Sequence, residues 1–119
     1  MIRVLGKDAA LAEVVREAQR EGADVLVVPA AADKRGSLER FAEVLRLPDW
    51  FGHNLDALAD CLHDLAENPP AEGATGRHLV WDGTQELHGA DPEAFEGICS
   101  VLGDVADEHA GFTVTVIDR

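Results

Sequence analysis

Three aspartates recur at a spacing of four residues in the middle of the chain, Asp56, Asp60 and Asp64 within "NLDALADCLHDL". Residues four apart lie on one side of a helix, and like charges at that spacing destabilise an isolated helix by roughly 0.2–0.5 kcal/mol per pair. No Lys or Arg occurs between residues 47 and 76, so no cation close in the sequence neutralises these carboxylates. Side chains in this pattern could hold a metal ion, or they could bind a cationic surface of another molecule.

The metal alternative adds two histidines, His53 and His63, to the three aspartates. Oxygen and imidazole ligands suit Mg²⁺, Mn²⁺ or Zn²⁺, but carboxylates one turn apart on an exposed helix need further ligands from other elements. The remaining histidines, His78, His88 and His109, are scattered along the chain, and we expect them to be solvated or structural. The sequence therefore predicts no metal site and no cofactor, and a metal-dependent enzyme is the lesser alternative.

Sequence motifs of common enzymes do not occur in the chain. GxSxG, HExxH, P-loop and GxGxxG patterns are all missing. The two cysteines, Cys61 and Cys99, lie on apolar helical stripes without a metal-type spacing, so buried free thiols are expected in place of a nucleophile. We therefore predict that the protein is not an enzyme.

Binding of a cationic surface is favoured by the loop before the aspartates and by the overall charge. Trp50 and Phe51 are adjacent, and Gly52 lets the backbone turn tightly or lets another surface come close. Trp is common at interface hot spots, although such a pair could instead pack on the protein's own core. The chain has 23 acidic and 10 basic residues, a formal net charge of -13, which disfavours nucleic acid and suits a basic partner.

Length and composition indicate a single globular domain. The chain has 119 residues, of which 46% are apolar, enough for one hydrophobic core. No apolar run approaches the roughly 18 residues that cross a bilayer, and the N-terminus does not resemble a secretory signal. We therefore expect a cytoplasmic protein with no membrane partner, and we expect it to be a monomer.

Hydrophobic periodicity predicts helices that alternate with strands, the order that favours a parallel sheet with helical crossovers. Helices are expected from Asp8 to Glu21 with Asp8 as cap, from Ser37 as cap until Pro48, after Asn54, and after Asp91 with Pro92 in the first position. Strands are expected at 25–28, 79–81 and 112–117, and residues 1–5 could add an edge strand.

The helix that carries the aspartates is amphipathic. Its apolar face consists of Leu55, Leu58, Cys61, Leu62 and Leu65. Asn54 is a good N-cap, and Asp56 lies in the first turn, where the helix dipole favours a carboxylate by about 0.3–1 kcal/mol. Asp60 and Asp64 have no such benefit and lie opposite the apolar face, so we predict that they point to solvent.

The stretch 47–62, "LPDWFGHNLDALADCL", strongly resembles the signature of the barstar family of intracellular ribonuclease inhibitors. The matching elements are Leu47-Pro48, an acidic residue, two aromatic residues, Gly52, Asn54-Leu55-Asp56-Ala57-Leu58 and Asp60-Cys61-Leu62. A weaker similarity extends from about Asp24 to Ile117. The resemblance implies an α/β fold in which a small three-stranded parallel sheet packs with about four helices. Residues 1–119 are then a single barstar-like domain, with 1–23 as an N-terminal helical extension.

The resemblance also implies a function, which is to plug the active site of a basic, guanyl-specific ribonuclease of the extracellular type. Asp60 would occupy the cationic site that binds substrate phosphate, and Asp56 would pair with a neighbouring arginine or lysine. The loop of Trp50, Phe51, Gly52 and Asn54 would cover the cleft. A module of the same fold that binds another basic partner without inhibiting a ribonuclease is the main alternative.

Several residues depart from the family pattern. Ala59 replaces a large aromatic residue of the best-known member, and His53 replaces an acidic residue. The Trp–Phe pair removes two phenolic hydroxyls. A further acidic contact from the last helix has three candidates, Asp104, Asp107 and Glu108. These departures bear on which ribonuclease is recognised.

Overall fold

The structure is a computed structural model of the chain, and it describes residues 2–48 and 51–119. The predicted site residue Trp50 lies outside the described residues. The strands are β1 (Ile2–Leu5), β2 (Asp24–Pro29), β3 (Arg77–Asp82) and β4 (Phe112–Ile117). The helices are α1 (Leu11–Arg20), α2 (Lys34–Leu45), α3 (Leu55–Glu67), α4 (Gln85–Ala90) and α5 (Pro92–Glu108). None of the described helices is long and apolar enough to cross a bilayer.

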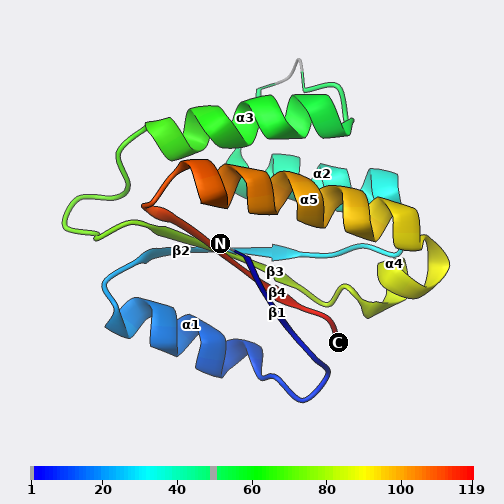
Figure 1. Cartoon of the computed structure of the whole chain (residues 1–119), viewed down its shortest axis with the longest axis horizontal. Coiled ribbons are helices and arrows are strands. Elements are labelled where there is room, and N and C mark those ends of the chain that lie inside the picture. The colour runs from blue at the N-terminus through cyan, green and yellow to red at the C-terminus, as the bar shows by residue number, and fades with distance from the viewer. Residues whose placement is uncertain (1, 49–50) are drawn as a thin grey trace.

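The four strands form one parallel sheet in the order β1-β4-β3-β2 (Figure 1). Strands β3 and β4 lie inside the sheet, where Leu79 of β3 is in register with Leu26 of β2 and Val114 of β4. Inner parallel strands are covered on both faces, which fits the apolar run 79–81 of β3, whereas β4 alternates apolar residues with Thr113 and Thr115. The predicted parallel α/β fold is confirmed, and the predicted edge strand at 1–5 forms β1 beside β4.

Helices cover both faces of this sheet. Helix α1 lies on one face, α2 and α5 lie on the other, and α3 packs on α5 as an outer layer (Figure 1). Side chains along β3 alternate between two hydrophobic cores, as the two-residue period of a strand requires. Leu79 and Trp81 belong to the large core under α2, α3 and α5, whereas Val80 packs with Val14 of α1 in the smaller core. Helix α3 thus rests on a well-packed base.

Two predicted helix caps are wrong. No side chain caps α1, so Asp8 does not have that role. Helix α2 begins before Ser37, because the Asp33 carboxylate accepts a hydrogen bond from the backbone N–H of Gly36 at 2.7 Å. Ser37 is buried inside the helix, and its hydroxyl accepts the backbone N–H of Ala31 at 3.1 Å. Ser37 therefore forms a hydrogen bond with the backbone of the loop before α2 and does not cap the helix.

One helix end and one additional helix also differ from the predictions. Helix α2 ends before Pro48, because Arg46 adopts a left-handed conformation with φ of 52° and the N–H of Leu47 bonds back to the carbonyl of Ala42 at 3.0 Å. The short helix α4 has no predicted counterpart, since one and a half turns of "QELHGA" are too few to establish a helical period.

Polar side chains close the carboxyl ends of β3 and β4. Asp82 accepts two hydrogen bonds from the guanidinium of Arg119, at 2.9 and 3.0 Å, and these bonds raise the pKa of Arg119. Asp118 accepts a hydrogen bond from the buried hydroxyl of Thr84 at 2.8 Å and lies 2.9 Å from Nδ1 of His88. Both carboxylates therefore have hydrogen-bonding partners within the chain itself.

Candidate protein-binding surface

Helix α3 is held by its cap and by its apolar face. Oδ1 of Asn54 accepts the backbone N–H of Ala57 at 2.8 Å, which confirms the predicted cap. Leu58 and Leu62 have no exposed surface, and Cys61 is 5% exposed. The predicted amphipathic helix is confirmed, and its polar side chains are carried by a rigid element.

The outward face of α3 is acidic. Asp56, Asp60 and Asp64 are all exposed, and no ion pair or hydrogen bond of their carboxylates to another described residue is found. Ala59, between the first two aspartates, is half-buried. Burial raises the pKa of the Cys61 thiol, and the charges of Asp64 and Asp60 raise it further. This helix thus carries negative charge that the described part of the chain does not neutralise.

The loop before α3 differs from the expectation in two respects. The ring of Phe51 is 4% exposed and belongs to the large core, so Phe51 supports the loop from below and does not offer its ring to solvent. The left-handed residue of the loop is His53, with φ of 51°, and not Gly52. The side-chain amide of Asn54 donates to the carbonyl of Gly52 at 3.4 Å, which ties the loop to the start of α3.

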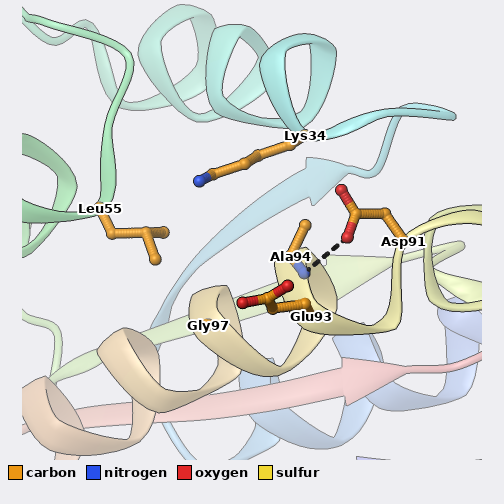
Figure 2. A pocket seen from close by; sticks show the side chains of 6 residues that line it. All are labelled: Lys34, Leu55, Asp91, Glu93, Ala94 and Gly97. Carbon is orange, nitrogen blue, oxygen red and sulfur yellow. Dashed lines mark hydrogen bonds between the residues drawn. The ribbon is translucent and has the colours of Figure 1, made fainter.

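A pocket of about 400 Å³ lies between the N-terminal ends of α2, α3 and α5 (Figure 2). It is lined by Lys34, Leu55, Asp91, Glu93, Ala94 and Gly97. Asp91 caps α5 by accepting the N–H of Ala94 at 3.1 Å, as predicted. A side chain at Gly97 would meet Leu55 at 2.8 Å, so this glycine permits the close approach of α3 and α5. Sequence reasoning missed the pocket, because its residues come from three separate helices.

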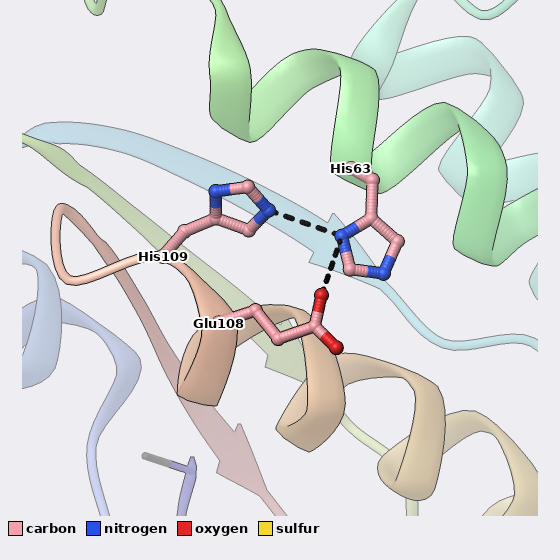
Figure 3. Close-up of side chains that lie close together, drawn as sticks. All are labelled: His63, Glu108 and His109. Carbon is pink, nitrogen blue, oxygen red and sulfur yellow. Dashed lines mark hydrogen bonds and ion pairs between the residues drawn. The ribbon is translucent and has the colours of Figure 1, made fainter.

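The structure does not bring together the residues that the sequence offered as an alternative metal site. His53, Asp56 and Asp60 do not gather into a metal-type cluster with other described residues. Instead His63 of α3 meets Glu108 and His109 at the end of α5 (Figure 3). Nδ1 of His63 lies 3.0 Å from Nε2 of His109 and 3.6 Å from a carboxylate oxygen of Glu108.

The remaining acidic candidates of the last helix, Asp104 and Asp107, are exposed on α5. Both cysteines are free, as predicted, but Cys99 is half-buried where full burial was expected. Burial raises the pKa of the Cys99 thiol to about 11, so it is a poor nucleophile at neutral pH. On the other face of the sheet, burial lowers the pKa of His78, whose Nε2 lies 2.8 Å from the hydroxyl of Thr115.

Comparison with known proteins identifies the family of this chain. A family model described as Barstar (barnase inhibitor) matches residues 23–118, well over half of the chain. The match includes α3, the loop before it and three of the four strands, and it begins after α1. The comparison with curated proteins gives no match. The chain therefore belongs to the barstar family of barnase-type ribonuclease inhibitors, which are not enzymes.

Proposed function

We propose that this protein inhibits a basic, guanyl-specific ribonuclease by placing the first turns of α3 in its active site. Asp60 occupies the cationic site that binds substrate phosphate, and Asp56 pairs with a neighbouring arginine or lysine of the enzyme. The loop that contains Trp50, Gly52 and Asn54 covers the rest of the cleft. The acidic helix thus imitates the RNA backbone and undergoes no reaction.

One observation carries this proposal: exposed carboxylates of α3 have no cation partner among the described residues, although the chain contains 10 Lys and Arg. Asp60 is exposed, and none of the described cations forms an ion pair with it. A cationic cleft would supply the missing opposite charges, and like charges one turn apart would then be stabilised together.

The packing of α3 supports the same proposal. Leu58 and Leu62 anchor the helix in the core, and Phe51 anchors the loop before it. Carboxylates carried by a rigid element lose little conformational freedom on binding, which lowers the entropic cost of the complex. Phe51 contributes by holding the loop in place, while Trp50 is the aromatic side chain proposed to contact the enzyme.

Local contacts around the aspartates set the choice of enzyme. Ala59 is small, so the proposed interface lacks one large aromatic contact between Asp56 and Asp60. His53 adds an imidazole where the family pattern has a negative charge. An acidic face attracts any cationic site, and discrimination depends on such neighbouring contacts. We therefore expect the target to differ in detail from the ribonuclease of the best-known family member.

The net charge of -13 also predicts how the complex forms. Opposite fields accelerate the encounter of two proteins, and salt screens this effect over about 8–10 Å at 0.1–0.15 M ionic strength. The association rate should therefore fall steeply as salt rises, with a smaller change in the dissociation rate. We propose that the inhibitor acts as a monomer in the cytoplasm of the cell that makes the ribonuclease.

We further propose that the chain is one domain in which residues 1–23 form an N-terminal extension. The family match begins at residue 23, so β1 and α1 lie wholly outside it. Strand β1 pairs with β4, and α1 covers the face of the sheet opposite α5. The extension protects an edge and a face that would otherwise be open to other chains.

The test is a titration of a guanyl-specific ribonuclease with the inhibitor, followed by RNA cleavage. Equimolar protein should abolish cleavage. Asp60→Ala should raise the dissociation rate by about 30- to 4,000-fold, because it leaves a buried enzyme cation unpaired at a cost of roughly 2–5 kcal/mol. The barstar family is itself a known example of such charge-pair coupling, so this range comes from that system.

Asp8→Ala is the matched control, because it removes an exposed carboxylate from the loop before α1, on the opposite face of the sheet. It should change the dissociation rate less than about twofold. Equal inhibition by Asp60→Ala and the parent protein would overturn the assignment of Asp60. Tight binding to another basic protein, without any effect on cleavage, would favour a binding module over an inhibitor.

A further inference from the structure

Beyond inhibition, we infer that His63, Glu108 and His109 form a divalent metal site, suited to Zn²⁺, that fastens α3 to the end of α5. One ligand atom from each residue lies within 4.8 Å of the others (Figure 3). Two imidazole nitrogens and a carboxylate oxygen are a ligand set that Zn²⁺ uses in proteins, with water in the fourth position.

The spacing of the ligand atoms fits a single ion. Zn–N and Zn–O bonds of about 2.0–2.2 Å at tetrahedral angles place two ligand atoms roughly 3.3–3.5 Å apart. The observed separations from Nδ1 of His63 are 3.0 Å to Nε2 of His109 and 3.6 Å to Oε2 of Glu108. These two values bracket the required distance, and the third pair, His109 and Glu108, also has ligand atoms within 4.8 Å of each other.

The backbone around the ligands is already held in place. The N–H of His109 bonds to the carbonyl of Val105 at 3.1 Å, and its carbonyl accepts the N–H of Phe112 at 2.9 Å. His63 follows the buried residues Cys61 and Leu62 on the packed helix α3. Ligands on such fixed elements need little ordering when the ion binds.

Electrostatics favour a cation at this position. Glu108 and His109 lie at the C-terminal end of α5, where the helix dipole is negative. The side chains of His63 and Glu108 are 30% and 67% exposed, so an ion can enter from solvent. Ring nitrogens must carry no proton to bind a metal, so metal binding displaces any hydrogen that lies between Nδ1 of His63 and Nε2 of His109.

The experiment uses the whole, metal-free protein and Zn²⁺ alone, without ribonuclease, so it is independent of the proposed inhibition. Calorimetric titration should show one Zn²⁺ per chain, and saturating Zn²⁺ should raise Tm, because the ion binds the folded state preferentially. Mg²⁺ at the same concentration should leave Tm unchanged, since it prefers oxygen ligands.

Variants of the three ligands identify the site. His63→Gln, His109→Gln and Glu108→Gln should each weaken Zn²⁺ binding by more than about 10–100-fold, the usual loss when even an outer partner of a metal ligand is removed. His88→Gln and Glu93→Gln are the matched controls, and each should keep the affinity and the Tm shift of the parent. The shift is measured against each variant's own metal-free Tm, so a loss of basal stability does not obscure it.

Three results would overturn the site. Zn²⁺ could fail to bind at micromolar concentration, or it could bind the His63 and His109 variants as tightly as the parent. Alternatively, Zn²⁺ could bind only with formation of a dimer in sedimentation, which would place its ligands on two chains and not within one.

Discussion

Carboxylates in two regions of the molecule have opposite surroundings. Asp82 and Asp118, at the carboxyl ends of β3 and β4, are 13% and 18% exposed and bind donors of the chain itself. Asp56, Asp60 and Asp64 on α3 are exposed and have no ion pair with another described residue. The first group stabilises the fold, whereas the second adds repulsion to the free protein. The acidity of α3 is therefore better explained by a partner than by the stability of the monomer.

Reversing a charge in the exposed group tests this contrast most strongly. Asp60→Lys should reduce ribonuclease affinity more than Asp60→Ala does, because like charges at an interface cost several kcal/mol. The free energy of unfolding of the free protein should change by less than about 0.5 kcal/mol, as expected of a surface position. Stopped-flow binding and urea unfolding measure the two quantities. A large loss of stability would mean that Asp60 has a structural role.

Removing a carboxylate from the paired group should have the reverse pattern. Asp118→Ala leaves the buried hydroxyl of Thr84 without its short acceptor and His88 without its partner, so we expect destabilisation of about 1–3 kcal/mol in urea unfolding. Thr84→Val in the same background should recover part of the loss, since it removes the unsatisfied hydroxyl. Unchanged stability of Asp118→Ala would contradict the structural role of this carboxylate.

The Asp82–Arg119 pair should make an intermediate contribution to the free energy of unfolding. Its geometry is bidentate, but the Arg119 side chain is 44% exposed, and exposed pairs are weakened by salt. Asp82→Ala should therefore destabilise less than Asp118→Ala, and part of its effect should disappear at about 1 M salt. Urea unfolding at low and high salt measures the difference. An effect that does not depend on salt would indicate that Asp82 acts through packing.

The smallest effect should come from neutralising a carboxylate that the monomer does not need. Asp64→Asn removes repulsion with Asp60 and a negative charge near the C-terminal end of α3, so it should stabilise the free protein by about 0.2–0.5 kcal/mol. Thermal unfolding at low salt measures this gain, and added salt should reduce it. Destabilisation would show that Asp64 belongs with Asp82 and Asp118 among the structural carboxylates.

Several features of the site depend on local physics and could be predicted from the sequence. Asn54 caps α3 because its short polar side chain bonds to a backbone N–H three residues later. The 3.6-residue period then places Leu58 and Leu62 inside and Asp60 outside. Neither step needs knowledge of distant residues.

The tertiary structure decided whatever depends on docking between elements. Asp and Ser are both common N-cap residues, and in the folded chain Asp33 caps α2 while Ser37 bonds to the preceding loop. Phe51 is drawn into the core beneath α3, although its neighbours in sequence suggested an exposed pair.

The contact between His63 and His109 joins residues 46 positions apart and exists only because α3 packs on α5. The sequence alone thus determined the helix, its cap and its acidic face, because hydrogen bonding and helical period act over a few residues. Only the folded chain decided which of these surfaces are covered, because burial depends on segments that meet from distant parts of the sequence.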